Sequence, residues 1–322
     1  MRVAVALLLL LLLATFAPAR LHQPPNIPAH LQIRFDPVPL DEDAPARRRI
    51  GGLTYLGGWA LRGNDPRFGG ISAIHVEGGE AVSVTDRGSV IRFPLPGVPG
   101  GSAPRLSALG GGPGSNAGKR NRDSEAMVVA NGRMWISFEY RNALWRYDPT
   151  GRQADAVALP PAMARWSRKA GGEAMVRMKD GRFLILSEGQ LLPDGSTEAL
   201  LFDGDPMRGG ASVLRLRYRA PKGYRITDAA LLADSRILFL NRRVSLPDGI
   251  TAKLTLGVLP ELKEGALLTG REIASFRPPV IADNLEALSV QEGHERTIVW
   301  IASDDNFSPL QRTLLLKFAL EE

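Results

Sequence analysis

The feature that most constrains the fold is a repeat of roughly 50 residues that occurs five times along the chain. Each copy begins with a short apolar segment around an alanine, turns, and continues into a second apolar segment that ends on charged or polar residues. The aligned alanines are Ala73, Ala126, Ala174, Ala229 and Ala287. A period of this length with several strands in each copy is typical of a β-propeller, in which every repeat forms one blade.

Turn residues and an unpaired strand refine this prediction. Asn131-Gly132 and Asp180-Gly181 are strong hairpin signals between the first two strands of a repeat. Residues 51–61 alternate loosely between apolar and polar side chains but have no hairpin of their own, so we expect them to pair near the C-terminal strand 313–319 and close the ring. Counting this extra strand beside five repeats, we predict a single-domain, all-β propeller with six blades.

The N-terminus has the pattern of a secretory signal. A basic start at Met1-Arg2 precedes an apolar run from Val3 to Ala14 and the small residues around Ala19. We predict cleavage after Ala19 and a periplasmic or secreted protein, with an uncleaved signal anchor as the alternative. The proline-rich segment that follows predicts a tether or strap. The expected domains are therefore 1–19, the signal peptide; 20–48, the proline-rich segment; and 49–322, the propeller.

Composition excludes several kinds of chemistry. The chain has no cysteine and only four histidines, which rules out disulfides, thiolate nucleophiles and histidine-rich zinc sites. Its formal net charge is +6, and the one basic cluster, Arg47-Arg48-Arg49, lacks the aromatic residues of a nucleic-acid motif. We therefore expect a small anionic substrate or ligand and no nucleic-acid partner. After signal cleavage we expect a monomer with no transmembrane segment.

An acidic residue precedes the aligned alanine in four of the five repeats, whereas the first repeat has Ser72 there. These acids are Glu125, Glu173, Asp228 and Glu286. On the innermost strands of a propeller they face the axis, where like charges repel unless a cation neutralises them. Oxygen ligands favour a hard cation, so we predict Ca²⁺ first and Mg²⁺ second. The alternative is that these acids only accept hydrogen bonds from the backbone of the next blade.

Charged residues also gather where the second strand of each repeat ends. The first two strands of a blade are antiparallel, so both sets of polar residues should meet at one mouth of the propeller. There we predict Asp304, Asp305 and Glu139 as general base or further metal ligands. The residues predicted to bind an anionic substrate are Arg87, Arg141, Arg242 and Arg312. The alternative is that acids and arginines form ion pairs between neighbouring blades.

Several of these motifs resemble a known family. They are Glu125-Ala126, Glu173-Ala174, Asn284-Leu285-Glu286-Ala287, Ser303-Asp304-Asp305-Asn306-Phe307 and Gln311-Arg312-Thr313-Leu314-Leu315. The region from about 51 to 318 is similar to the bacterial phytase-like domain, also called esterase-like activity of phytase. This resemblance implies an exported β-propeller with a Ca²⁺-dependent phosphoester or ester hydrolase activity. The chain departs from the expected pattern at Ala287, where glycine is expected, and at Asp228, which replaces glutamate.

Three functions remain open at this stage. The leading hypothesis is a metal-dependent hydrolase of phosphate esters or other esters. The alternatives are a non-enzymatic propeller that binds a ligand or protein at the cell envelope, and a lactonase-type hydrolase that uses the same acids around Ca²⁺. The propeller fold does not separate them, because one fold hosts many functions.

Overall fold

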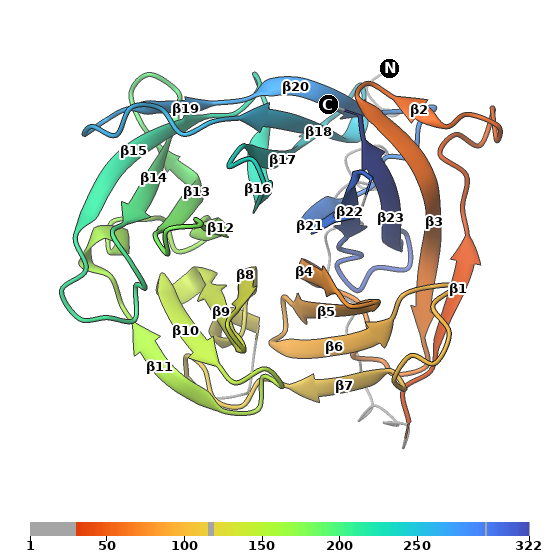
Figure 1. Cartoon of the computed structure of the whole chain (residues 1–322), viewed down its shortest axis with the longest axis horizontal. Helices are drawn as coiled ribbons and strands as arrows, with labels where there is room; N and C mark the ends of the chain where they lie inside the picture. Colours follow the sequence, from red (N-terminus) through yellow and green to blue (C-terminus); the bar gives the residue numbers. More distant parts are fainter. Residues whose placement is uncertain (1–29, 115–118, 294, 322) are drawn as a thin grey trace, which may run out of the picture.

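The computed structural model describes residues 30–114, 119–293 and 295–321. It is an all-β propeller of five blades, with strands β4, β8, β12, β16 and β21 innermost around the axis (Figure 1). Each inner strand contacts the inner strands of both neighbouring blades, so the ring is closed. Among the described residues, no helix has the length and apolar character needed to cross a membrane.

Each blade is an antiparallel sheet that runs from the axis outward, and one short parallel strand is added to blade 3. The strands are β4 (Ile71–Glu77), β5 (Glu80–Thr85), β6 (Ser89–Pro94) and β7 (Arg105–Ala108) in blade 1; β8 (Ser124–Ala130), β9 (Arg133–Phe138), β10 (Ala143–Tyr147) and β11 (Ala154–Ala158) in blade 2; β12 (Gly172–Arg177), β13 (Phe183–Leu191), β14 (Thr197–Phe202), β15 (Val213–Arg219) and β19 (Leu267–Thr269) in blade 3; β16 (Arg225–Leu231), β17 (Ile237–Ser245), β18 (Gly249–Gly257) and β20 (Arg271–Phe276) in blade 4; and β21 (Leu285–Glu292), β22 (Thr297–Ser303), β23 (Thr313–Leu320), β3 (Leu53–Gly63) and β1 (Ile33–Pro37), with β2 (Arg49–Ile50) beside β3, in blade 5. Three short 3-10 helices are η1 (Lys119–Asn121), η2 (Glu139–Arg141) and η3 (Pro161–Met163).

The prediction of six blades is wrong, although the predicted closing strand does pair with the C-terminal strand. Strand β3 lies antiparallel to β23, with Leu61 opposite Thr313 and Leu53 opposite Leu320. The fifth repeat supplies only three strands, β21 to β23, so β3 completes this blade as its fourth strand. A strand that satisfies an existing sheet edge leaves no edge on which to build another blade.

The described part of the proline-rich segment is a strap on the outside of blade 5. Strand β1 pairs with β3, and Ile33 lies opposite Gly63. Farther along, Leu40 is fully buried, and Asp41 forms an isolated bridge with Val280. The predicted signal peptide 1–19 lies outside the described residues, so export of the protein stays a prediction.

The hydrophobic core is divided into five clusters, and each one fills the space between two neighbouring blades. Aromatic pairs cross these interfaces. Trp135 of blade 2 packs against Phe183 of blade 3 with ring centroids 5.4 Å apart, and Phe276 of blade 4 packs edge-on against Phe318 of blade 5 at 5.7 Å. Since every blade buries its faces only against its neighbours, the stability of each blade depends on closure of the whole ring.

Candidate functional site

A β-bulge interrupts each of the five inner strands at the same place. The register of β12 against β13, for example, passes from the pair Gly172 and Ser187 to the pair Ala174 and Leu186 and leaves Glu173 unpaired. Such a bulge redirects a side chain away from the regular alternation of a strand. The bulged residues are Ser72, Glu125, Glu173, Thr227 and Glu286. All five line one cavity at the propeller axis, which we call the axial cavity.

A second ring of side chains lies beside this one. In each blade, the residue just before the bulge pairs with a residue near the end of the second strand. The member of the second ring comes directly after that paired residue. The members are Asp86, Glu139, Glu188, Arg242 and Asp304. These five also line the axial cavity, which has a volume of about 330 Å³. The two observed rings of side chains therefore meet in one cavity at the axis.

Acidic groups dominate the axial cavity. Among the described residues, eight carboxyl groups line it, against two basic side chains, Lys169 and Arg242. Burial raises the pKa of Glu125 well above its ordinary value, and the charges of Glu173 and Asp123 raise it further. Burial and the nearby charge of Glu188 raise the pKa of Glu173 in the same direction. Glu125 and Glu173 are therefore held in a site that disfavours their ionised forms.

Arg242 is the basic member of the second ring and compensates part of this charge. Its guanidinium forms an ion pair with Glu286 and lies 3.8 Å from Oε1 of Glu188. Burial alone lowers the pKa of Arg242, but Glu286 and Glu188 more than offset this effect and raise it. On the other side of Glu286, burial raises the pKa of Asp304, and the charges of Glu286 and Asp86 raise it further.

Three acids of the cavity are arranged as a candidate metal centre. Asp123, Glu125 and Glu139 each place one carboxylate oxygen within 4.8 Å of the other two. Oxygens that share one Ca²⁺ at about 2.4 Å lie no more than about 4.8 Å apart, so this spacing fits a single ion. Asp123 precedes β8, Glu125 is its bulged residue, and Glu139 begins η2. A single blade thus supplies the whole triad.

Asp228, predicted as a metal ligand, does not line the axial cavity. Its carboxylate accepts hydrogen bonds from the backbone N–H of Ala229 at 2.8 Å and of Leu288, on the inner strand of blade 5, at 2.7 Å. This contact matches the alternative in which an acid bonds the backbone of the next blade. The bulged residue of blade 4 is Thr227, so the alignment on Ala229 placed the fourth repeat one residue too late.

Asp305, predicted as a general base or ligand, also lies outside the residues that line the cavity. One of its carboxylate oxygens accepts hydrogen bonds from the backbone N–H of Gly70 and of Phe307, both at 2.9 Å. The other accepts a bond from the hydroxyl of Thr313 at 2.8 Å. Gly70 has a φ of +64°, and a Cβ there would meet the ring of Phe307 at 2.3 Å, so glycine is needed at this contact. Asp305 thus joins blade 5 to blade 1.

Of the four predicted anion-binding arginines, only Arg242 lines the axial cavity. The others contact residues outside it: Arg87 lies 3.6 Å from the ring centroid of Phe307, Arg141 donates to Oδ1 of Asn121 at 2.8 Å, and Arg312 donates to Oδ2 of Asp283 at 3.4 Å. A role for these three in substrate binding stays a prediction. Glu125, Glu173, Glu286, Glu139 and Asp304 all line the cavity, and their predicted roles as ligands or bases stay predictions.

Reasoning from the repeats missed Asp123 and Lys169, which also line the cavity. Asp123 lies two residues before the bulge, where the first and third repeats have Gly70 and Gly171. A carboxylate that occurs in only one repeat is invisible to an alignment that looks for recurrence. The available signal was local: two acids at alternate positions, Asp123 and Glu125, at the start of a strand.

Comparison with known proteins agrees with this architecture. The model of the phytase-like family, described as esterase-like activity of phytase, matches residues 66–307. The chain belongs to the phytase-like family. The matched region contains both rings of the axial cavity and the metal-candidate triad of this phytase-like protein.

No curated protein matches this phytase-like chain. Among solved structures, glutaminyl cyclase from Myxococcus xanthus has a TM-score of 0.45 and 10% identity, with coverage of 79% of this chain and 92% of that one. A Saccharomyces cerevisiae complex of Dbp5 with Nup159, Gle1, IP6 and ADP contains a chain with a TM-score of 0.35 and 8% identity, with coverage of 91% and 96%. At these similarities neither structure contributes to the functional argument.

Proposed function

We propose that this phytase-like propeller hydrolyses small esters, phosphate esters among them, in the axial cavity with a divalent cation, Ca²⁺ first, held by Asp123, Glu125 and Glu139. The observation that carries the proposal is the convergence of these three carboxylates, at a spacing that fits one ion, in a cavity where acids greatly outnumber bases. The family description names an esterase-like activity, which supports the same reaction class.

The donor set suits a hard cation. Its three ligand atoms are carboxylate oxygens, and the described residues that line the cavity offer no sulfur and no histidine nitrogen. Without a cation, repulsion and burial hold the pKa of Glu125 high. A divalent ion offsets both effects, because it stabilises the ionised carboxylates that contact it. When bound, it would polarise an ester carbonyl or phosphoryl oxygen as a Lewis acid.

The remaining cavity residues can move and orient protons. Asp304 has a pKa raised by burial and by the charges of Glu286 and Asp86, so it retains a proton at a higher pH than an ordinary aspartate. This is the property of a general acid that protonates a leaving alkoxide. Glu173, whose pKa burial and Glu188 raise, is a second carboxyl suited to proton transfer. Arg242 holds Glu286 in place through their ion pair.

A neighbouring hollow offers room for the rest of the substrate. It has a volume of about 540 Å³ and shares Glu188 with the axial cavity. Its wall carries Lys222 and Arg225, and Nη1 of Arg225 lies 3.8 Å from Oε2 of Glu188. Basic groups beside an acidic cavity suit an ester whose distant part is anionic, because the axial cavity disfavours anionic groups that the cation does not contact.

The test combines elemental analysis with an activity screen. Purified protein is analysed for bound metal and then assayed on carboxylic esters, phosphomonoesters and lactones, with and without excess chelator. We expect one divalent cation per chain, turnover that disappears with chelator, and recovery on addition of Ca²⁺. Glu125→Gln should lose both metal and turnover, whereas Glu295→Gln, at an exposed position away from the cavity, should keep both.

The outcomes separate the functional hypotheses. Turnover that persists in excess chelator contradicts the proposal. A bound cation with no turnover over the whole panel favours the non-enzymatic ligand-binding propeller. Turnover confined to lactones favours the lactonase-type hydrolase, which would use the same carboxylates.

A further inference from the structure

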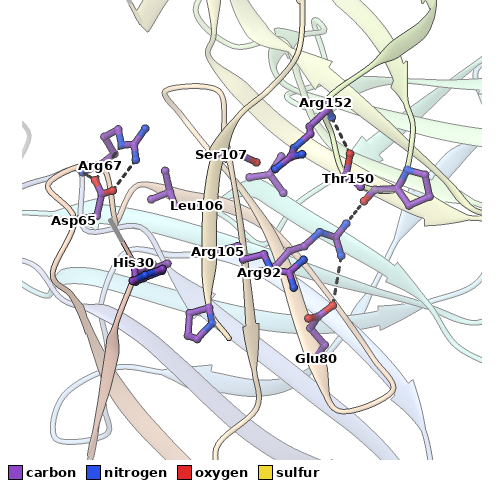
Figure 2. Close-up of a pocket in the computed structure, with 14 residues that line it drawn as sticks. His30, Asp65, Arg67, Glu80, Arg92, Arg105, Leu106, Ser107, Thr150 and Arg152 are labelled. Atoms are coloured by element: carbon purple, nitrogen blue, oxygen red, sulfur yellow. Dashed lines mark hydrogen bonds and ion pairs between the residues drawn. The ribbon is translucent and has the colours of Figure 1, made fainter. Parts of the chain in front are cut away.

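A second pocket lies on the outer rim of the propeller, far along the sheet from the axis. It has a volume of about 520 Å³ and lies at strand β7, the outermost strand of blade 1. In Figure 2, Ser107 of β7 lies on the side of Arg92, Thr150 and Arg152, whereas Leu106 lies on the side of His30 and Arg67. We call the half that contains Arg92, Arg105, Ser107 and Arg152 the rim pocket.

Strand pairing forces two arginines together in the rim pocket. Arg92 of β6 lies directly opposite Arg105 of β7, and Val90 lies opposite Ser107. Residues directly opposite in an antiparallel pair point to the same face, and like charges in such a pair repel. Arg152, in the turn between β10 and β11 of blade 2, approaches the same space from across the blade interface (Figure 2). Two blades therefore bring three guanidinium groups to one pocket.

The acids near this pocket already have cationic partners. Asp65 is bound by Arg67, whose guanidinium donates to both of its carboxylate oxygens at 3.0 and 2.6 Å. Glu80 lies 3.5 Å from Arg92 and accepts a bond from the hydroxyl of Ser102 at 2.5 Å.

Arg92 also spans the blade interface and donates to the backbone carbonyl of Pro149. In the part of the chain that the structure describes, no ion pair involves Arg105 or Arg152. These two guanidinium groups therefore keep their charge-assisted donors available to a ligand.

We propose that the rim pocket is a binding site for a phosphate group, held by the guanidinium groups of Arg105 and Arg152 and by the hydroxyl of Ser107. Guanidinium forks bind phosphate oxygens bidentately, and a bound anion relieves the repulsion between Arg92 and Arg105. The whole cavity, of which the rim pocket is one half, falls within the volume range of small-molecule sites. Val90 and Pro149 add apolar wall, which suits a phosphate carried by a small organic body.

This site is independent of the hydrolase proposal, because it lies at the outer part of the blades and, among the described residues, shares no lining residue with the axial cavity. The ligand's phosphate could be a soluble phosphomonoester or the headgroup of an anionic lipid. Both present the same oxyanion, and they differ in whether binding requires a membrane surface.

The experiment measures phosphate binding with the axial cavity kept metal-free by chelator, so that its carboxylates repel the anion. Inorganic phosphate and glycerol phosphate are titrated into the full chain by calorimetry, and vesicles with and without phosphatidylglycerol are tested by co-sedimentation. We expect the dissociation constant for phosphate to rise about tenfold for each arginine removed, in Arg105→Ser, Arg152→Ser and the double variant. Arg105→Lys should give an intermediate loss, because lysine keeps the charge but not the bidentate geometry.

The matched control is Arg208→Ser with Arg277→Ser, which removes the same charge from two exposed positions on other loops. This control should bind phosphate like the unaltered protein. Equal binding by the unaltered protein and the Arg105→Ser/Arg152→Ser variant, or equal weakening by the control pair, would overturn the proposal. So would absence of binding by the unaltered protein to all three probes. Binding to the soluble phosphates identifies a free ligand, and binding only to the anionic vesicles identifies a lipid headgroup.

Discussion

The axial cavity concentrates negative charge in a buried site, whereas the rim pocket concentrates positive charge at the exposed surface. In the cavity, Asp123 and Asp304 are each only 3% exposed, so water screens their charges poorly. At the rim, Arg105 and Arg152 are exposed, and water and salt weaken their repulsion. A cluster of like charges at the surface therefore reduces stability only slightly. A buried cluster needs compensation by protonation, an internal ion pair or a bound ion.

The largest expected effect comes from removing the internal compensation of the cavity. Arg242→Met should destabilise the metal-free protein by ~3–5 kcal/mol, because it leaves Glu286 and Glu188 buried without their cation. Denaturant unfolding with chelator present measures this loss. Arg277→Met, at an exposed position, is the control and should change little. If both variants unfold alike, Arg242 does not balance the charge of the cavity.

Glu125→Gln should have smaller effects: it should weaken calcium binding and stabilise the metal-free protein. Calcium affinity should fall roughly 100-fold, since the triad loses one charged ligand. At about pH 8 without metal, the same variant should be more stable than the unaltered protein by ~1 kcal/mol, because one source of repulsion is gone. Calcium titration and thermal unfolding in chelator measure the two changes. A loss of stability in both states would instead indicate that Glu125 has a purely structural role.

The buried carboxyl groups of the axial cavity should make the stability of the metal-free protein depend on pH. Burial raises the pKa of Glu173 and of Asp304 above the values in the unfolded chain, so the folded state binds these protons more tightly. Their contribution to stability is complete below the ordinary carboxyl pKa of about 4 and is lost as the pH rises through the raised values. Each tenfold difference in proton affinity between the folded and unfolded chain corresponds to ~1.4 kcal/mol of this loss.

Metal-free protein should therefore melt at a lower temperature at about pH 8 than at about pH 5. Calcium should reduce this difference, because it stabilises the ionised carboxylates. Melting curves across this range, with chelator or with calcium, give the answer. A metal-free protein that becomes more stable with rising pH would contradict the assigned directions of these pKa changes.

The smallest effect is expected at the rim. Arg105→Ser with Arg152→Ser should change the free energy of unfolding by no more than ~0.5 kcal/mol, because both side chains are exposed and neither forms an ion pair in the described structure. At low salt the double variant should gain slightly, and this gain should vanish at high salt. Thermal unfolding at two salt concentrations measures it. A loss as large as that of Arg242→Met would show that these arginines support the fold.

The repeats carried most of the architecture because each blade repeats the same local chemistry. Apolar alternation and the Asn131-Gly132 turn predicted hairpins that the structure contains between β8 and β9 and elsewhere. The blade count failed because a strand that joins an existing sheet has the same local sequence pattern as one that begins a new sheet. Only the pairing of β3 with β23, a contact between the two ends of the chain, distinguishes the two cases.

For the site, sequence reasoning found the bulged acids in the three repeats where one precedes the alanine. It failed in the fourth, where Asp228 takes the position that alanine has in the other repeats, so alignment on Ala229 selected Asp228 and missed the bulged Thr227. Only the position of the bulge identifies Thr227, and bulges depend on cross-strand register that the local sequence does not encode. Pairing of Glu286 with Arg242 was likewise open, because it joins residues of two different blades.

The seam between β3 and β23 also bears on how the molecule is made. A ribosome completes β3 well before β23, so blades 1 to 4 can assemble in the order of synthesis while β3 waits without this partner. A chain truncated before Thr313 would lose the strand that pairs with β3 and would expose that edge of β3. The eight-residue strand β23 is thus made after the strands of blades 1 to 4, and its pairing with β3 joins two segments far apart in the sequence.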